Sequence, residues 1–403
     1  MSAYIVTAVR SAVGKVGKNG GALSNVHSVD LGGQILDQLV INTPSLDPAD
    51  VDDVIFGCVT QIGENAGNLA RQCILSSTQL PITVPGTTVD RQCGSSQQAV
   101  HFAAQAVMSG TQDIVIAGGV ESMGRVPMFS NFAKGKFGNP NNSKIQEKFG
   151  TDQSFFSQFV GAEMMGVKFC ISRSDMDSFA AYSHEKATIA QANGVFKDEI
   201  VPIDVGDGTF HTIDEGVRPG TTAEKLSTLK TLVEAGMAQP VEGGDANGSI
   251  TAGNASQMSD GGSAILVVND AGLKKLGGSV TPLAMIRNLS LAASDPILML
   301  SAPIPATQKL LKTAGLTIND IDRYEVNEAF AVVPLAWQKE LGADPKKLNV
   351  NGGACALGHP LGATGGKLLT SLVHELKRSE KQYGLLAICE GGGTANATLI
   401  ERC

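Results

Sequence analysis

The stretch Leu385-Leu-Ala-Ile-Cys-Glu-Gly-Gly-Gly393 is a short apolar run that ends in glycines, and an earlier run, Asp113-Ile-Val-Ile-Ala-Gly-Gly119, closely resembles it. Such runs are typical of strands buried in a parallel sheet. A second pair, residues 46–54 and 316–324, shares a Leu-x-x-x-Asp-Val/Ile-Asp pattern at nearly the same separation. We therefore expect two similar βαβ halves, the alternative being a chance match between segments of low complexity. Halves that face each other would bring their strand-end loops together, where α/β sheets bind ligands.

Residues 121–257 differ in composition from the segments on either side. Pro, Asn, Phe and Lys become common up to Gly150, which indicates an inserted loop. A helical region is expected over 163–194, a strand over 199–205 and a polar loop over 251–262, before a strand resumes at 264–268. We therefore expect three parts: a core half over 1–120 that resumes at about 258–280, a loop domain over 121–257, and a second core half over 281–403.

The rest of the core alternates between strands and helices. Strands are expected over 4–9, 51–57 and 87–90, and helices over 27–40, 93–109 and 367–377, with a short helix starting at Asp47-Pro48. The helix over 93–109 has few large side chains, which favours close packing in an interior.

Composition excludes several classes of protein. The chain has 403 residues, 42% hydrophobic and 17% charged, with 47 glycines, which predicts a folded protein of two or three domains and argues against disorder. A net charge of −8 without a Lys/Arg run argues against nucleic-acid binding. No apolar run reaches membrane-spanning length, and the N-terminus has no apolar signal core.

The cysteines indicate a reducing compartment. They are seven in number, scattered and without a Cys-x-x-Cys pair, so neither a disulfide framework nor a zinc site is expected. We therefore predict a cytoplasmic protein with free thiols.

The stretch Asn351-Gly-Gly-Ala-Cys-Ala-Leu-Gly-His-Pro-Leu-Gly-Ala-Thr-Gly-Gly366 places one histidine, His359, among glycines and small residues. Backbone and ligand can approach closely in such a loop. A phosphate-binding P-loop is excluded, because Leu361 and Leu368 occupy positions that require Gly and Ser or Thr. The alternative is that His359 is only a turn residue.

Three reactive side chains are expected on loops at strand ends. Cys93 opens a predicted helix, whose dipole should lower the thiol pKa, and His359 can act as its base. Cys389, where a strand gives way to glycines, is expected to be an exposed second thiol able to transfer a proton. Any one of these cysteines taken alone could instead be a small core residue.

Together these features resemble the thiolase family over nearly the whole chain. The resemblance rests on short motifs that occur in the family's order. They are Arg10-Ser-Ala-Val-Gly14, Gly57-Cys-Val-Thr-Gln-Ile-Gly63, Cys93-Gly-Ser-Ser, Gly118-Gly-Val-Glu-Ser-Met123, Thr251-Ala-Gly-Asn-Ala-Ser256, Asn327-Glu-Ala-Phe330, Gly358-His-Pro-Leu-Gly-Ala-Thr-Gly365 and Cys389-x-Gly-Gly-Gly393.

The resemblance implies an α/β fold of two βαβαβ halves in five αβαβα layers, with a loop domain that covers coenzyme A. It implies that Cys93 is the acylated nucleophile, His359 its base and Cys389 the second acid/base. It further implies that Asn327 orients a water in one oxyanion hole, and that the N–H groups of Cys93 and Gly391 form the other.

The resemblance also implies the substrates and partners. Coenzyme A is a substrate and not a permanently bound cofactor, no metal is used, and the chain forms a homodimer or homotetramer. Arg218 is expected to lie against the adenine and Ser256 against the pantetheine. The acyl pocket is expected to include Gln158, Phe159 and Phe330.

Three positions depart from the family pattern. Arg10-Ser-Ala lacks the usual proline, and Ala395 replaces a glycine, which is expected to tighten the neighbouring turn. Ser157-Gln158-Phe159 stands where the family often has His-Met-Gly, and looks more like thiolases that act on bulky or steroid-derived chains. The alternative is that this segment merely repacks the loop domain.

The predicted activity is an acetyl-CoA C-acyltransferase that cleaves 3-ketoacyl-CoA or runs the reverse Claisen condensation. A ketosynthase-type condensing enzyme is disfavoured by Asn327-Glu-Ala-Phe330 in place of a second histidine. A non-catalytic acyl-CoA or lipid-binding relative is disfavoured by the presence of Cys93, His359 and Cys389 together.

Overall fold

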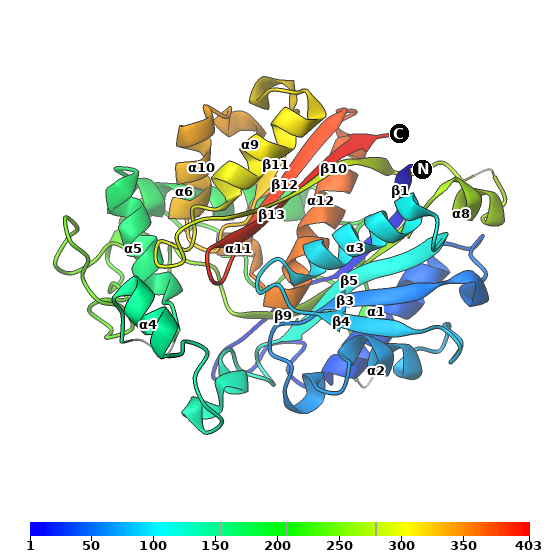
Figure 1. Ribbon diagram of the computed structural model, residues 1–403, viewed down its shortest axis with the longest axis horizontal. Coiled ribbons are helices and arrows are strands. Elements are labelled where there is room, and N and C mark those ends of the chain that lie inside the picture. The colour runs from blue at the N-terminus through cyan, green and yellow to red at the C-terminus, as the bar shows by residue number, and fades with distance from the viewer. Residues whose placement is uncertain (153–154, 207, 279) are drawn as a thin grey trace.

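Two sets of strands with the same connectivity form the centre of the molecule in the computed structural model, which describes residues 1–403 except 153–154, 207 and 279 (Figure 1). If the four main strands of each set are numbered along the chain, they lie side by side in the order first, fourth, third, second. The same order in both sets confirms the internal repeat. The first set is β1 (Ala3–Ser11), β3 (Asp53–Gly57), β5 (Ile114–Ser122) and β9 (Ser259–Val268), with β4 (Gly86–Val89) added at its edge. The second is β10 (Ala284–Ala293), β11 (Arg323–Val326), β12 (Tyr383–Glu390) and β13 (Thr394–Arg402).

Two aspartates explain why the repeat is visible in the sequence. The N–H of Asp52 donates to the carbonyl of Ile114 at 2.9 Å, and its Oδ2 accepts from the N–H of Ile114 at 3.0 Å. Asp322 makes the same pair of bonds with Tyr383, at 3.0 and 2.9 Å. Each aspartate follows a 3₁₀ turn, Pro48–Asp50 or Ile318–Asp320, and fixes the start of the central parallel strand of its half.

The two sets meet edge to edge. β1 pairs antiparallel with β10 through Ala3–Ile286, Tyr4–Met285 and Ile5–Ala284. Within the described residues this joins them, together with β2 (Gly14–Lys15) and β6 (Ile200–Val201), into an 11-stranded sheet.

Helices cover both sets and fill the space between them, which gives the expected five layers (Figure 1). α1 (Ser28–Ile41) and α2 (Leu69–Ser76), the latter not predicted, pack on the outer face of the first set. α3 (Ser95–Ser109) and α12 (Thr364–Arg378) lie between the sets, and α9 (Pro303–Ala314) and α10 (Val332–Leu341) cover the second.

Alternation along β12 shows how one strand serves two layers. Leu386 and Ile388 pack into the central helical layer, whereas Leu385 and Ala387 face the outer helices. Because successive strand residues point to opposite faces, this apolar run is buried on both sides, as the sequence predicts.

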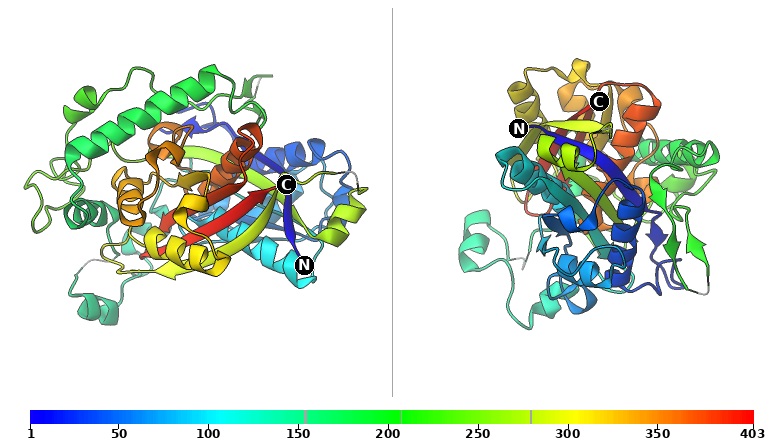
Figure 2. Two further views of the ribbon diagram at one scale, coloured as in Figure 1. Left: turned by 90° about the horizontal axis from the view of Figure 1, so that it is seen from above. Right: turned by 90° about the vertical axis from the view of Figure 1, so that its right-hand side faces the viewer.

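Helices are the main regular elements of the region between β5 and β9, joined by long irregular segments (Figure 1). It contains α4 (Ser143–Phe149), α5 (Gln158–Lys168), α6 (Arg173–Ala192), β7 (Ile203–Asp204), β8 (Phe210–His211) and α7 (Ala223–Ser227). Figure 2 shows the long α6 lying along the C-terminal half, where it packs against α11 (Ala354–Leu357). The short α8 (Asp270–Lys275) follows β9. The domain boundaries at 120, 257 and 280 stay a prediction.

Three local expectations in this region are wrong. The helical region 163–194 is two helices, because Ser172 and Asp175 form a capping box that starts α6 anew. The strand over 199–205 is split at Pro202, with β6 pairing with β1 and β7 with β8. The polar loop over 251–262 ends early, because β9 already begins at Ser259.

Candidate active site

The glycines of the His359 loop allow it to touch the opposite half of the protein. A Cβ on Gly362 would lie 2.6 Å from the Cα of Cys58, and one on Gly365 would lie 2.3 Å from the backbone N of Gln97. Such contacts are too short for any side chain, so larger residues would push the loop away from β3 and α3. Close backbone approach, expected from the sequence, is therefore confirmed.

A buried carboxylate, Glu121, ties this loop to the first half. Its Oε2 accepts hydrogen bonds from the N–H groups of Val59 at 2.9 Å and Gly362 at 2.8 Å, and its Oε1 accepts from that of Thr60 at 3.1 Å. Burial raises the pKa of Glu121, against the lowering effect of these donors. The sequence motif contained this glutamate, but its role as a bridge between loops was not foreseen.

The hydrogen bonds of His359 fix its tautomer. Nδ1 lies 2.6 Å from Oγ1 of Thr364, and that hydroxyl donates its single proton to the carbonyl of Pro360 at 2.9 Å. The hydroxyl must therefore accept a proton from Nδ1–H, which leaves Nε2 unprotonated. Burial, helped by the charge of Lys367, lowers the pKa of His359 to about 3, so the ring is neutral near pH 7.

Asn327 faces that free nitrogen. Its Nδ2 lies 3.4 Å from Nε2 of His359, and its backbone N–H donates to the carbonyl of Ala387 at 3.0 Å. The side-chain Oδ1 is buried and has no hydrogen-bond partner among the described residues. The structure thus brings Asn327 and His359 together, and leaves one amide oxygen available to a further donor.

Cys93 does not stand where the sequence analysis put it. α3 begins at Ser95, with Gly94 as its N-cap, and Cys93 is only 9% exposed. Burial raises the pKa of the Cys93 thiol to about 12, and the charge of Glu390 adds to the rise. The predicted lowering by the helix dipole is wrong, because loss of hydration outweighs it.

Cys389 lies at the end of β12 and is 1% exposed, so the expected exposed thiol is wrong as well. Its pKa is raised well above the usual value by burial and then by the proximity of Cys93. Ala395 lies within β13, paired with Cys389, and so does not tighten the turn. The turn is made by Gly392 and Gly393, with φ of 78° and 80°.

Gly391 and Cys93 lie at the same cavity. Both line a space of about 770 Å³. A Cβ on Gly391 would lie 2.9 Å from Oε1 of Gln92, the residue before Cys93. The structure therefore places the glycine turn after β12 directly beside the cysteine-bearing loop.

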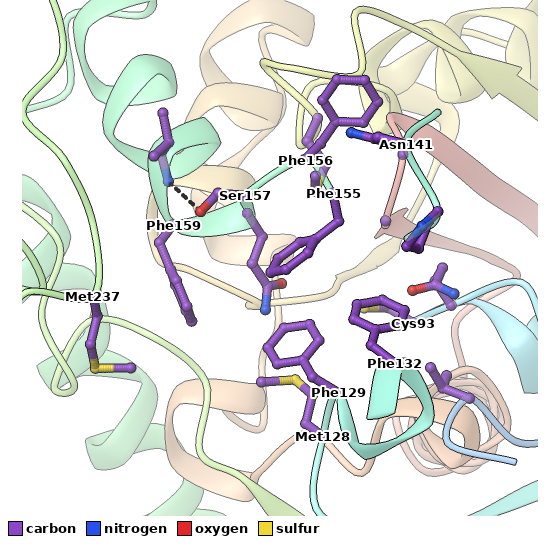
Figure 3. Close-up of a pocket in the computed structure, with 18 of the residues that line it drawn as sticks. Cys93, Met128, Phe129, Phe132, Asn141, Phe155, Phe156, Ser157, Phe159 and Met237 are labelled. Atoms are coloured by element: carbon purple, nitrogen blue, oxygen red, sulfur yellow. Dashed lines mark hydrogen bonds between the residues drawn. The ribbon is translucent and has the colours of Figure 1, made fainter. Parts of the chain in front are cut away.

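Phenylalanines dominate the rest of this cavity (Figure 3). Phe129, Phe132 and Phe155 form a triangle with ring centroids 5.3–5.7 Å apart, and in the view of Figure 3 they gather between Cys93 and Phe159. Figure 3 also shows the Ser157 hydroxyl capping the start of α5.

The three predicted acyl-pocket residues are close together. Gln158 and Phe159 both line the cavity. Phe330 is not among the lining residues: it is 3% exposed and packs against Phe159, with the rings at right angles and their centroids 6.1 Å apart.

Arg218 and Ser256 are not part of that cavity lining. Both belong to segments attached to Gln257, whose carbonyl accepts from the N–H of His359 at 3.1 Å and whose amide donates to Gly216 at 2.8 Å. The Arg218 side chain is exposed, and Ser256 is half-buried. Arg218 and Ser256 thus lie on two segments that Gln257 connects to the loop carrying His359.

The described residues contain no group of three or more His, Cys, Asp and Glu side chains arranged to hold a metal ion. None of the helices in the described part of the chain combines the length and apolar character needed to cross a bilayer.

Known proteins resemble this chain along its whole length. Residues 3–271 match the family model of the thiolase N-terminal domain, and residues 280–402 match that of the C-terminal domain. The steroid 3-ketoacyl-CoA thiolase FadA6 of Mycobacterium tuberculosis is 48% identical, over 99% of this chain and 94% of that protein. The 3-ketoacyl-CoA thiolase of Bacillus subtilis is 40% identical, over 100% and 99%.

A solved structure agrees with these matches. The crystal structure of the Bacillus anthracis acetyl-CoA acetyltransferase superposes with a TM-score of 0.86 at 36% identity, covering 100% of this chain and 99% of that one. The repeated halves, the loop pair that carries Cys93 and His359, and these matches agree: the chain belongs to the thiolase family and is an acyltransferase that acts on CoA esters.

Proposed function

We propose that this thiolase cleaves 3-ketoacyl-CoA by way of an acyl group carried on Cys93. The observation that carries the proposal is the tautomer of His359: Thr364 holds the proton on Nδ1, so Nε2 is a neutral base. A buried thiol whose pKa is raised needs such a base, because it does not ionise by itself near pH 7.

We assign the steps of the reaction to these residues as follows. His359 takes the thiol proton as the sulfur of Cys93 attacks the keto carbon. The bond between C2 and C3 breaks, and its electron pair leaves as the acetyl-CoA carbanion, which Cys389 protonates. Coenzyme A then gives its thiol proton to Cys389 and takes the acyl group, and the released thiolate of Cys93 recovers its proton from His359. Read backwards, the same steps are a Claisen condensation.

Two sites would stabilise the negative charge that develops on oxygen. The backbone N–H groups of Cys93 and Gly391 are assigned to one, supported by their common cavity. The other is assigned to His359 and a water held by Asn327, supported by the buried, unpartnered Oδ1. Donors preorganised in this way contribute roughly 3–4 kcal/mol each in well-studied cases.

Arg218 and Ser256 are assigned to coenzyme A, with the adenine at Arg218 and the pantetheine at Ser256. The support is their attachment, through Gln257, to the loop that carries His359. Coenzyme A enters as a substrate and leaves as a product, without a permanently bound cofactor.

The acyl group is assigned to bulky chains, longer than acetoacetyl and of fused-ring type at the upper end. Support comes from the phenylalanine-lined cavity of about 770 Å³ and from the name of the FadA6 relative, a steroid 3-ketoacyl-CoA thiolase. Broad aromatic faces bury flat apolar surface without demanding one exact chain length.

Steady-state kinetics on acetoacetyl-CoA, a linear long-chain 3-ketoacyl-CoA and a fused-ring 3-ketoacyl-CoA test this assignment. We expect kcat/KM to rise in that order, in steps of roughly tenfold, because a buried methylene is worth about 1–3 kcal/mol. Gln158→Met should shift the preference back towards acetoacetyl-CoA, and Gln105→Met, exposed on α3, should not. Equal or better activity on acetoacetyl-CoA, unchanged by Gln158→Met, would mean that residues 157–159 only repack the loop domain.

We also propose a homodimer or homotetramer in the cytoplasm. The short strand β4 ends the sheet with its outer edge unpaired among the described residues, and such an edge can pair with a second copy. Light scattering of the purified protein measures the assembly directly, and a monomer at working concentration would contradict it.

A further inference from the structure

Glu390 is a buried acid beside the proposed nucleophile, and the mechanism above does not use it. Its side chain is in the same polar pocket as Thr394, whose hydroxyl donates to Oε2 at 2.7 Å. Oε1 is buried and accepts no hydrogen bond from any described residue. An uncompensated carboxylate oxygen in this position is costly, so a role other than packing has to be considered.

The carboxyl group rests on the backbone that follows Cys93. A Cβ on Gly94 would lie 1.9 Å from Oε1 of Glu390 and 2.8 Å from its Cδ. Position 94 must therefore be glycine for Glu390 to occupy its place. The carboxyl group of Glu390 is therefore in direct contact with the backbone of the segment that carries Cys93.

We propose that Glu390 is a positioning residue whose protonation state controls how readily the Cys93 thiol ionises. When the carboxyl group is protonated, it supports the Cys93–Gly94 backbone without opposing a thiolate. When it is ionised, its negative charge lies in a poorly hydrated pocket against Gly94, the residue next to Cys93, and disfavours a second negative charge on the thiol. This inference rests on the proposed function only in taking Cys93 as the nucleophile.

The groups around the carboxyl act in both directions. Burial raises the pKa of Glu390 to about 8, while Thr394, the charge of Arg91 and the N–H of Asn396 lower it and Asp90 raises it. Its protonation therefore changes near neutral pH. His101 next to Arg91 stays neutral there, because burial lowers its pKa to about 3.

Other charges act on the thiol itself. Burial is the largest cause of the raised pKa of Cys93, followed by the charge of Glu390, then by Glu121 and Asp90. The pKa of Cys389 is raised by burial, then by the charge of Cys93 and then by that of Glu390. Glu390 is therefore the principal charge that raises the pKa of Cys93, and it also helps to raise the pKa of Cys389.

The consequence is a specific shape of pH dependence. Below the pKa of Glu390 the carboxyl is neutral and the reactivity of Cys93 rises with pH as it would for a lone thiol. Above it, each further step in pH also ionises Glu390, which raises the pKa of Cys93 and flattens the rise. Removing the charge should restore the steeper curve on the alkaline side only.

The test is the rate of alkylation of Cys93 by iodoacetamide in the full-length protein, followed by peptide mass spectrometry between about pH 6 and 9.5. In Glu390→Gln the rate relative to wild type should be close to one at pH 6 and roughly three- to tenfold higher above pH 8, the size expected of one nearby charge. Thr394→Val keeps the charge but removes a hydrogen bond that stabilises it, so the flattening should move to higher pH.

Asp113→Asn, just before β5 in the other half of the molecule, is the matched control and should leave the ratio at one throughout. A ratio for Glu390→Gln that is independent of pH, or reduced at every pH, would overturn the proposal and leave Glu390 as a packing residue. If Glu390→Gln does not fold, an unshifted profile in Thr394→Val overturns it equally. Failure of wild-type thiolysis would contradict the proposed function but not this ratio, because alkylation needs no substrate.

Discussion

Nδ1 of His359 lies 2.6 Å from Oγ1 of Thr364, and the hydroxyl continues 2.9 Å to the carbonyl of Pro360. His359 and Pro360 lie on one loop of the C-terminal half and Thr364 begins α12 directly after it, so this short segment sets the tautomer of its own histidine. The nitrogen left free faces Asn327, on the loop that follows β11. The proposed base therefore has its tautomer set before any substrate binds.

Thr364→Val removes the proton acceptor with little change in shape. We expect kcat to fall roughly ten- to a hundredfold, the range seen when the orienting partner of a histidine is lost in metal sites, with KM little changed. Thr370→Val is the control, because Thr370 is buried on the same helix and its hydroxyl has no partner among the described residues. Equal losses in both variants would show that the effect is packing and not tautomer.

His359→Ala should cost more rate than Asn327→Ala. His359 is assigned two tasks, base and hydrogen-bond donor, whereas Asn327 acts through a water. Loss of Asn327 should therefore resemble loss of one oxyanion donor, roughly a hundred- to a thousandfold in kcat. Single-turnover acylation rates provide the measurement, and the reverse ranking would contradict both roles.

Cys389→Ala should separate the two cysteines. The variant should still become acetylated on Cys93, because attack on the thioester needs His359 and not Cys389. Proton transfer to and from the second substrate should slow by roughly a hundred- to ten-thousandfold. Rapid-quench measurement of acylation and of release to coenzyme A distinguishes the steps, and equal loss of both would refute the division of labour.

The buried ion pair between Arg10 and Asp214 should matter for stability. Two hydrogen bonds of 2.8 and 3.0 Å join them, and both side chains are buried. Asp214→Asn removes one of the two carboxylates that pair with Arg10, Glu199 being the other, and should cost up to about 3 kcal/mol of unfolding free energy. Glu401→Gln, in the exposed pair with Arg287, should cost less than about 1 kcal/mol.

The same pair predicts a pH dependence. Burial alone would raise the pKa of Asp214, but Arg10 outweighs it and the pKa is lowered. The stabilisation is therefore complete above the unfolded value of about 3.9 and is lost as pH falls through the lower folded value. Chemical denaturation at several pH values should show the wild-type advantage over Asp214→Asn constant near neutrality and shrinking only below about pH 4.

The sequence revealed the fold because its strongest signals are local. Asp52 and Asp322 each bond the start of a central strand, and this pattern repeats over a few consecutive residues. The glycines of the His359 loop likewise show a need for close approach. Membership of the thiolase family then follows from the order of the motifs.

What the sequence could not provide depends on partners distant in the chain. The pKa of Cys93 was predicted with the wrong sign, because a helix start is visible locally whereas burial against Glu390 is not. The bridge made by Glu121 and the tether of Gln257 were missed for the same reason. The break at Ser172 was missed although its capping box is local, because the apolar pattern continues across it.

The central claim is that Cys93 carries the acyl group. The most direct measurement is the intact mass of the protein after incubation with acetyl-CoA, followed by peptide mapping, with Cys403→Ala as a control for an exposed thiol. We predict the gain of one acetyl group, located on Cys93, in both proteins and its absence in Cys93→Ala. Acetylation at another residue, or none at all, would contradict the account.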